Sequence, residues 1–384
     1  MLLIIFARLN GGLTMNIREL RNMFPALSRT VYGKQLVYFD NAATAQRSQS
    51  VIDKWTQLTI GANANIHRAV HKLAVDATDE YESTRDAVKE YINAAAREEI
   101  VFTSGTTGSI NLVAFSFGET FVNKGDEIIV SESEHHSNIV PWQMLCQRKG
   151  AVLRVLHVDE DGHLNLEELK SLLNPKTRIV AVTQISNVLG ILNPVKEIVS
   201  VCHSVGCPVL IDGAQGMVHE GVDVQDVDCD FYAFSGHKLY AATGTGVLYG
   251  KRKWLDQMVP YQGGGEMIAT VRFSGTTYAP LPEKFEAGTQ NINAIPTLEP
   301  AIEMLKLMKD KELLNAQEAV SQYLLHALTS NPRIRLYGVP RGTETKIPLF
   351  SFSVEGAHHE DLALILDKMG IAVRSGQMCA EPLM

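Results

Sequence analysis

Seven short apolar segments alternate with segments of helical periodicity through the middle of this chain, and this alternation constrains the fold more than any other feature. The strand-like segments are Ile100–Thr103, Glu127–Ser131, Ala151–Leu156, Arg178–Thr183, Pro208–Ile211, Phe231–Phe234 and Thr245–Tyr249. Helical spacing lies between several of them, as in Leu166–Leu173 and Val195–Val205. The pattern predicts an α/β fold with a mainly parallel, seven-stranded sheet covered by helices on both faces. Ligands bind such sheets at the carboxyl ends of the strands.

The pattern changes near residue 296. Amphipathic helical segments and short strand-like pieces then follow one another as Thr297–Lys309, Lys311–Thr329, Leu349–Val354, His359–Met369 and Ile371–Arg374. We interpret this part as a second, smaller α+β domain. The sequence therefore predicts a large domain over residues 31–295 and a small domain over residues 296–384. Residues 15–30 are expected to pack with the small domain.

The composition is that of an ordinary globular protein. The chain has 384 residues, 45% hydrophobic and 20% charged, enough to bury a sizeable core. A net charge of -8 without long charged runs argues against nucleic acid as a partner. Residues 1–14 are apolar but too short to cross a bilayer, and we expect an upstream extension ahead of Met15. Five cysteines without a CxxC pair indicate reduced thiols and a cytoplasmic location. We expect no membrane partner.

Two of the predicted strands end in residues that can do chemistry. Asp212 follows the strand in "PVLIDGAQ", with Gln215 three residues later. Ser235, His237 and Lys238 follow the next strand in "FYAFSGHKLY". An aspartate at such a place is, on its own, more often a turn or capping residue. Because strand ends share one edge of the sheet, we expect these side chains to converge on one crevice.

Small residues open a helix after a third strand, in "FTSGTTGSINLVA". The hydroxyls and free backbone N–H groups between Ser104 and Gly108, among them those of Thr107, suit a phosphate group. A plain capped turn is an equally good interpretation. The closing residues of a Walker motif are absent.

A histidine pair, His135 and His136, follows another strand in "SESEHHSNIVPW". Adjacent side chains usually point in different directions, and no nearby His or Cys completes a ligand set. We therefore expect no metal site. A flat imidazole that stacks on an aromatic ligand fits the pattern better.

Taken together, a phosphate cradle, an acid, a flat imidazole and a lysine at strand ends fit one ligand, pyridoxal 5′-phosphate. Its aldehyde needs a lysine to form a Schiff base, and its pyridine nitrogen needs an acid that keeps it protonated. Lys238 and Asp212 are the residues expected in these two roles.

The sequence also resembles a known family, the group II (SufS/CsdA-type) cysteine desulfurases, which are class V, fold type I pyridoxal-phosphate enzymes. The motifs that carry this resemblance occur in family order from about Met15 onward: "YFDNAAT", "ANIHRAVH", "FTSGTT", "EHHSNIVPWQ", "SNVLG", "DGAQ", "SGHK", "GGGEMI", "FEAGTQN" and "RSGQMCAEPLM". Each motif alone is weak, whereas the ordered set is specific. The resemblance implies the PLP-dependent transferase fold (fold type I) for the large domain.

The resemblance also implies a role for each matched residue. Lys238 would form the Schiff base, Asp212 would pair with the pyridine nitrogen, and Gln215 would bond the ring hydroxyl. His135 would stack on the ring and move protons. The cofactor phosphate would be held by Thr107, Ser235, His237 and, from the neighbouring subunit of a homodimer, Thr289. Asn187 would lie near the ring, and the substrate pocket would be lined by Asn187, His67 and Arg374.

Cys379 separates the activities that this scaffold can support. A desulfurase needs a thiolate in addition to Lys238, and Cys379 follows Arg374, a cation that favours the thiolate. The other four cysteines are expected to be structural. The resemblance implies that Cys379 takes the sulfur of L-cysteine as a persulfide and leaves L-alanine. It further implies a SufE- or SufU-like acceptor protein, iron–sulfur cluster assembly, and L-selenocysteine as a second substrate.

Two alternatives stay open, and two features depart from the family. A kynureninase-like or class V aminotransferase activity is disfavoured by Cys379, and a non-catalytic sulfur-carrier or scaffold role by the Lys238, Asp212 and His135 set. Gln377 and Met378 stand where family members commonly have two histidines. The family also usually continues for several tens of residues past this chain's last residue, with an arginine that binds the substrate carboxylate. We therefore expect reduced turnover from the chain as given.

Overall fold

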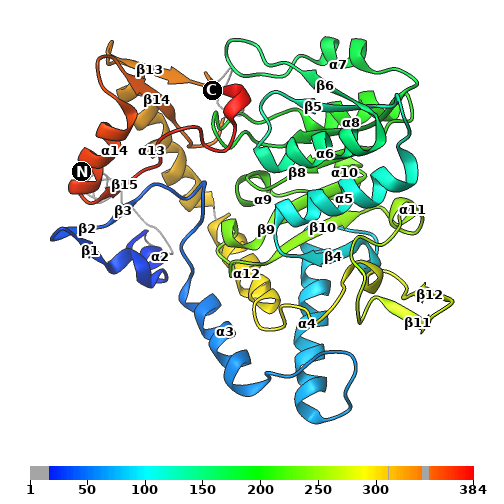
Figure 1. Ribbon diagram of the computed structural model, residues 1–384. Coiled ribbons are helices and arrows are strands. Elements are labelled where there is room, and N and C mark those ends of the chain that lie inside the picture. The colour runs from blue at the N-terminus through cyan, green and yellow to red at the C-terminus, as the bar shows by residue number, and fades with distance from the viewer. Residues whose placement is uncertain (1–16, 310, 340–345) are drawn as a thin grey trace.

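The computed structural model describes residues 17–309, 311–339 and 346–384 (Figure 1). The expected extension over residues 1–14 lies outside the described residues. Within them, no helix combines the length and the apolar character that crossing a membrane requires.

A seven-stranded sheet forms the centre of the larger part of the molecule. Its order is β4-β10-β9-β8-β7-β5-β6. β10 runs antiparallel to β9 and β4, and the other neighbours are parallel. The prediction of a mainly parallel sheet is confirmed, and every predicted strand agrees with its observed bounds to within one residue. These bounds are β4 Ile100–Thr103, β5 Glu127–Ser131, β6 Val152–Leu156, β7 Thr177–Thr183, β8 Val209–Asp212, β9 Phe231–Ser235 and β10 Gly246–Gly250.

Helices cover both faces of this sheet because its central strands are apolar on both sides. On β9, Tyr232 and Phe234 pack into one layer, while Phe231 and Ala233 pack into the other. The first layer contains α4 (Lys72–Tyr91), α7 (Leu166–Leu172), α8 (Val195–His203) and α12 (Leu298–Met308). The second layer contains α5 (Thr106–Phe121), α6 (Val140–Lys149) and α11 (Arg252–Leu255).

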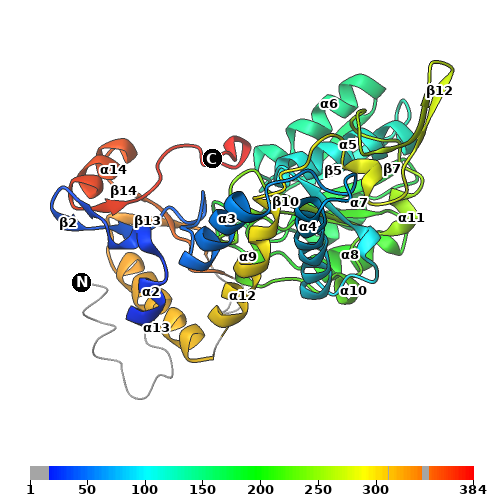
Figure 2. The same ribbon diagram turned by 90° about the horizontal axis from the view of Figure 1, so that it is seen from below.

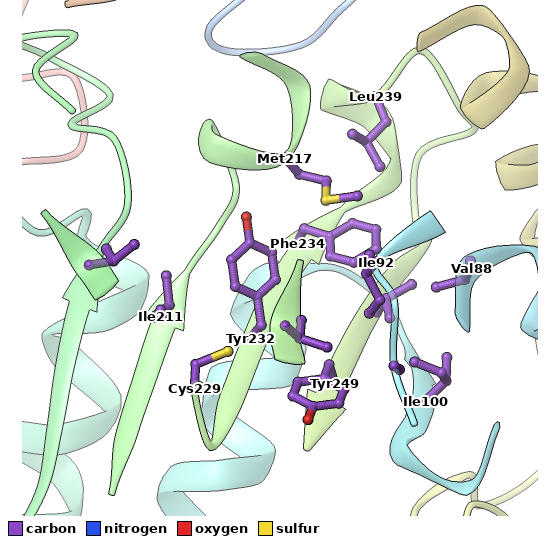
Figure 3. Close-up of a cluster of buried hydrophobic side chains, with 14 of the residues drawn as sticks. Val88, Ile92, Ile100, Ile211, Met217, Cys229, Tyr232, Phe234, Leu239 and Tyr249 are labelled. Atoms are coloured by element: carbon purple, nitrogen blue, oxygen red, sulfur yellow. The ribbon is translucent and has the colours of Figure 1, made fainter. Parts of the chain in front are cut away.

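The first layer joins α4 to the antiparallel end of the sheet. Figure 3 shows Val88 and Ile92 beside Phe234 of β9 and Tyr249 of β10, all of them buried. Burying an aliphatic or aromatic side chain of this size contributes about 1.5–3 kcal/mol. This packing holds β9, whose last residue is the predicted site residue Ser235.

A smaller group of elements lies to one side of the sheet (Figures 1 and 2). It contains an antiparallel pair, β13 and β14, and a parallel pair between β3, near the N-terminus, and β15, near the end of the chain. The sequence did not predict β13, and β14 begins two residues later than predicted. The bounds are α2 Ile17–Asn22, β1 Thr30–Val31, β2 Lys34–Gln35, β3 Val37–Tyr38, α13 Lys311–Thr329, β13 Ile334–Tyr337, β14 Ser351–Val354, α14 His359–Lys368 and β15 Ile371–Ala372.

The remaining elements connect these two groups or extend from the large one. The β11–β12 hairpin projects away from the sheet (Figure 2). The bounds are α3 Gln49–Gly61, α9 Gly216–His219, α10 Val224–Val227, β11 Ile268–Arg272 and β12 Gly275–Tyr278. Short 3₁₀ helices are η1 Pro25–Ser28, η2 Arg97–Glu99, η3 His136–Asn138, η4 Gly236–Lys238, η5 Glu283–Phe285, η6 Ile295–Thr297 and η8 Glu381–Leu383.

Candidate active site

A polar cavity, open to solvent, lies where β7, β8 and β9 end and α5 begins. This is the edge of the sheet at which the sequence predicts ligand binding. Nine of the twelve predicted site residues line the cavity: Thr107, His135, Asn187, Asp212, Gln215, Ser235, His237, Lys238 and Arg374.

Lys238 ends η4, the turn that follows β9. Burial lowers the pKa of its amine, and Arg374 acts in the same direction, whereas Asp212 and Cys379 oppose the shift. A buried amine with a lowered pKa holds more of the neutral form, which is the nucleophile that attacks a carbonyl carbon.

Asp212 is the last residue of β8 and is 3% exposed. Burial raises the pKa of its carboxyl, while Lys238 and the N–H of Ala214, which donates to Oδ1 at 2.9 Å, lower it. An acid in this setting can pair with a protonated ring nitrogen. Gln215 lies beside it and donates from Nε2 to the carbonyl of Ala42 at 2.7 Å, which fixes the cavity wall near residue 42.

The start of α5 forms a small-residue cradle next to β9. Ser235 Oγ accepts the N–H of Thr106 at 2.7 Å and lies 2.8 Å from Thr106 Oγ1. Gly105 precedes the helix at φ 144°, a conformation that favours glycine, and as the N-cap residue it has no side chain that could accept from the first turn. First-turn N–H groups of a helix lack intrahelical partners and attract anions. The cradle therefore fits a phosphate group, with both Thr106 and Thr107 at the cavity.

The two adjacent histidines have different surroundings. His135 lines the cavity, and its Nδ1 accepts the N–H of Ser137 at 3.0 Å, so the neutral ring carries its proton on Nε2. Burial, helped by Lys238, His136 and Arg374, lowers the pKa of His135 to about 4. His136 Nε2 instead accepts the N–H of Glu381 at 3.0 Å. Across the residues that the structure describes, no three His, Cys, Asp or Glu side chains gather as a metal ion would require.

Cys379 lies on a loop that docks against the large domain beside the cavity. Asn187 Nδ2 donates to the carbonyl of Met378 at 2.8 Å, and His136 N–H donates to the carbonyl of Cys379 at 2.8 Å. Met378 lines the cavity, whereas the Cys379 thiol is exposed. The next residue, Ala380, is fully buried. The loop thus presents a free thiol at the edge of the site.

Arg374 lines the cavity and pairs with a residue that the sequence reasoning did not select. Its Nε lies 3.3 Å from Asp40 Oδ1. The two residues follow β15 and β3, which pair in parallel through Ile371 and Val37. That pairing explains how positions more than three hundred residues apart meet.

Besides Cys379, which lies beside the cavity, two other predicted residues do not line the cavity of this chain. His67 Nε2 lies 3.1 Å from Glu82 Oε1, and Thr289 is exposed. The role predicted for Thr289 belongs to a neighbouring subunit, and it stays a prediction. The sequence reasoning also missed residues that line the cavity, among them Ser137 and Thr183. Thr183 is the last residue of a strand, and Ser137 lies two residues after His135, signals that could have found them.

Comparison with known proteins agrees with the fold and the cavity. Residues 37–384 match the family described as aminotransferase class-V, and the chain belongs to this family, whose members depend on pyridoxal 5′-phosphate. A relative named cysteine desulfurase from Pectobacterium carotovorum subsp. carotovorum (strain PC1) is 46% identical over 369 residues, covering 96% of this chain and 90% of the relative.

Two solved structures have similar folds. The crystal structure of the cysteine desulfurase CsdA (S-sulfonic acid) from Escherichia coli has a TM-score of 0.86 at 38% identity, covering 97% of this chain and 90% of that one. The apo cysteine desulfurase from Thermococcus onnurineus NA1 has a TM-score of 0.88 at 34% identity, with coverage of 97% and 91%. Within its family, the chain therefore groups with the cysteine desulfurases. The predictions of family, fold class and cofactor are confirmed.

Proposed function

We propose that this chain converts L-cysteine to L-alanine, with Cys379 receiving the sulfur atom. The observation that carries the proposal is the meeting of a buried lysine, Lys238, with a docked loop that presents an exposed thiol at the same cavity. A transaminase or a kynureninase-like enzyme has no use for that thiol. The names of the similar proteins support the same choice.

The residues of the cavity fit pyridoxal 5′-phosphate. When bound, this group supplies an electrophilic carbon and a ring that withdraws electrons from the substrate. Lys238 would hold it covalently, Asp212 would pair with its ring nitrogen, Gln215 would bond its hydroxyl, and His135 would lie against its ring. The phosphate would be bound by Thr107, Ser235 and His237, at the cradle where α5 begins.

Proton movement would be divided between two groups. Lys238, once released by the incoming substrate amine, is a neutral base in a buried setting and would take the proton from the substrate Cα. His135 is neutral, with its proton on Nε2, and would move protons at the ring edge. Asn187 and Arg374 would contact the substrate, and the guanidinium of Arg374 offers its carboxylate a charge-assisted hydrogen bond.

The sulfur step belongs to Cys379. Its thiolate would attack the substrate sulfur, forming an S–S bond as the substrate Cβ–S bond breaks. The bonding electron pair stays with the substrate and is protonated, so that one thiol and one cysteine give one persulfide and one alanine. No external oxidant or reductant is needed for this balance.

Several finer assignments belong to the same proposal. We propose a homodimer in which Thr289 of the neighbouring subunit reaches the cofactor phosphate and His67 lines the substrate pocket. The persulfide sulfur would pass to a SufE- or SufU-like acceptor for iron–sulfur cluster assembly, and L-selenocysteine would be a second substrate. The exposed Cys379 thiol supports transfer to another protein. Five free cysteines support a cytoplasmic location.

The test measures alanine and sulfide released from L-cysteine by the purified protein with added pyridoxal 5′-phosphate and a thiol reductant, which reduces the persulfide to the Cys379 thiol and sulfide. Lys238→Ala should lose both the activity and the cofactor adduct that borohydride fixes on the wild-type lysine. Cys379→Ser should keep the cofactor and lose alanine release, whereas Cys146→Ser, a buried cysteine on α6, should keep both. Full alanine release by Cys379→Ser would show that another residue accepts the sulfur.

A further inference from the structure

Glu134 is a buried carboxyl group directly behind the cavity wall that carries His135. It is 0% exposed, and three donors converge on its two oxygens. Oε1 accepts the N–H of Thr183 at 2.8 Å and the hydroxyl of Ser131, and Oε2 accepts the amide N–H of Asn138 at 2.7 Å. No lysine or arginine among the described residues forms an ion pair with it. Hydrogen bonds from Thr183, Ser131 and Asn138 therefore hold the Glu134 carboxyl group in place.

We propose that Glu134 is a positioning residue of the active site, which holds the segment carrying His135 and the end of β7 in register with one another. This inference rests on the proposed function, because His135 and Thr183 matter only if the cavity binds the cofactor. Glu134 itself does not line the cavity. It would act through the residues that it holds.

The hydrogen bond between Thr183 and Glu134 begins where the backbone pairing of β5 and β7 ends. The pairing between β5 and β7 ends at Val130 and Ala181. The N–H of Thr183, two residues further along β7, then donates to Glu134 instead of to a strand. Thr183 lines the cavity and is in register with Asp212 on β8. The carboxyl of Glu134 therefore fixes the strand end beside the acid proposed to pair with the cofactor ring.

The contact with Asn138 closes the turn that contains His135. Glu134 precedes η3 and Asn138 is its last residue, so their hydrogen bond spans the segment from which the imidazole enters the cavity. The fully buried Trp142 donates from Nε1 to Asn138 Oδ1 at 3.0 Å, which fixes the orientation of the amide. Asn138 must consequently point its NH₂ group at Glu134. The position of His135 thus depends on an acceptor at residue 134.

The donors around Glu134 allow a test that does not depend on whether its carboxyl group is ionised. The N–H of Thr183 and the amide of Asn138 are both obligatory donors, and each takes one oxygen of Glu134. In Glu134→Gln one of these oxygens becomes an NH₂ group, so one donor must face another donor. Adding Asn138→Asp removes that conflict, because the new carboxylate accepts from the amide at position 134 and from Trp142.

Asp230 provides a matched control at the opposite end of the sheet. It is also a 0% exposed acid with three hydrogen-bond donors: His203 Nε2 at 2.7 Å, Trp254 Nε1 at 2.7 Å and the N–H of Val209 at 2.9 Å. Unlike Glu134, it also forms an ion pair, with Lys253 Nζ at 3.2 Å from Oδ1. Val209 begins β8, whereas the cavity lies at the other end of that strand. Asp230→Asn should lower the melting temperature and leave the cofactor dichroism and kcat unchanged.

The experiment compares the wild type, E134Q, E134Q/N138D and D230N, each saturated with pyridoxal 5′-phosphate. Four quantities are measured: the melting temperature, the visible circular dichroism of the bound cofactor, and kcat and KM for L-cysteine. E134Q should change the cofactor dichroism and lower kcat by about 10- to 100-fold, because small displacements of positioned groups cost that much. E134Q/N138D should restore both. D230N should change only the melting temperature.

The outcomes separate the possible failures. A wild type that binds no cofactor or releases no alanine overturns the proposed function itself. With an active wild type, the inference fails if E134Q melts lower but keeps its dichroism and kcat, as D230N should. It also fails if the double variant is no better than E134Q, or does not fold, since restored hydrogen bonding would then not be what the segment needs.

Discussion

Arg85 on α4 is a fully buried cation whose removal should have a consequence that can be worked out from its contacts. All five of its N–H groups have acceptors. Nε and Nη2 donate to Glu82 at 3.1 Å each, and Nη1 and Nη2 donate to Glu286 at 2.7 and 2.9 Å. Nη1 also donates to the carbonyl of Ile100 at 2.8 Å. The Arg85 and Glu286 side chains are 0% and 2% exposed.

Arg85→Met removes these bonds and leaves Glu286 as a buried carboxylate without its cation. The carboxylate would keep the N–H of Phe102 at 2.6 Å and the hydroxyl of Tyr81 at 3.3 Å. Breaking a buried ion pair in this way costs about 3–5 kcal/mol. At an unfolding entropy of about 2.1 cal/mol/K per residue, the 384-residue chain should lose about 4–6 °C in melting temperature.

The assay follows thermal unfolding by circular dichroism in the presence of excess pyridoxal 5′-phosphate. The control is Arg85→Met combined with Glu286→Gln, which removes the unpaired charge but keeps an oxygen that accepts from Phe102. This pair should recover most of the lost stability, because the penalty comes from the uncompensated charge. A single variant that melts with the wild type, or a double variant that melts lower still, would refute this reasoning.

Two further predictions concern the surroundings of the site. Although burial opposes it, hydrogen bonding to His67 and Arg85 lowers the pKa of Glu82 to about 2 from its ordinary 4.5, and the bond to Glu82 raises the pKa of His67 above 6.5. The lowered pKa of Glu82 adds to the free energy of unfolding above pH 4.5, and this stability is lost as the pH falls towards 2. The raised pKa of His67 adds to the free energy of unfolding below pH 6.5, and this stability is lost at higher pH. The melting temperature of Glu82→Gln should therefore lie furthest below wild type between these two pH values, and a difference that does not vary with pH would contradict the assignment. A Cβ on Gly246 would lie 2.3 Å from the Cα of Gly105, so Gly246→Ala should destabilise by about 1–3 kcal/mol and weaken cofactor binding, measured by titration. Gly61→Ala, with nothing within 4 Å, is the control that should leave both unchanged.

The large sheet was predictable because its strands are buried on both faces. Continuous apolar runs such as "FYAF" stand out from the amphipathic helices between them, and β5 and β9 are buried along their whole lengths. The small-domain strand β13 escaped prediction because it alternates between partly buried and exposed residues over only four positions. The strand order, with antiparallel β10 between β4 and β9, could not be read from local periodicity.

The site was predictable to the extent that its residues follow strand ends. Asp212 and Lys238 were found in this way, and both line the cavity. The network behind them was not found. In "SESEHH", Glu134 is buried under the cavity wall, while Glu132 accepts the N–H of Val158 and is partly exposed. Their difference arises after β5 ends, where the period of the strand no longer tells which side a residue faces.

The same physical constraint governs both sides of the cavity wall. A parallel strand that ends at a ligand site has backbone N–H groups with no further strand to bond, and burying them unpaired is costly. Here a carboxyl group, that of Glu134, takes the N–H of Thr183, and Glu286 takes the N–H of Phe102 on β4, the edge strand that pairs antiparallel with β10. Each acid then also holds a segment that carries a candidate site residue, since Glu134 flanks His135 and Glu286 lies three residues before Thr289. The same carboxyl groups therefore pair the free strand N–H groups and position the segments of the site. A substitution at either acid should disturb both the hydrogen bonding of the strand and the position of the segment.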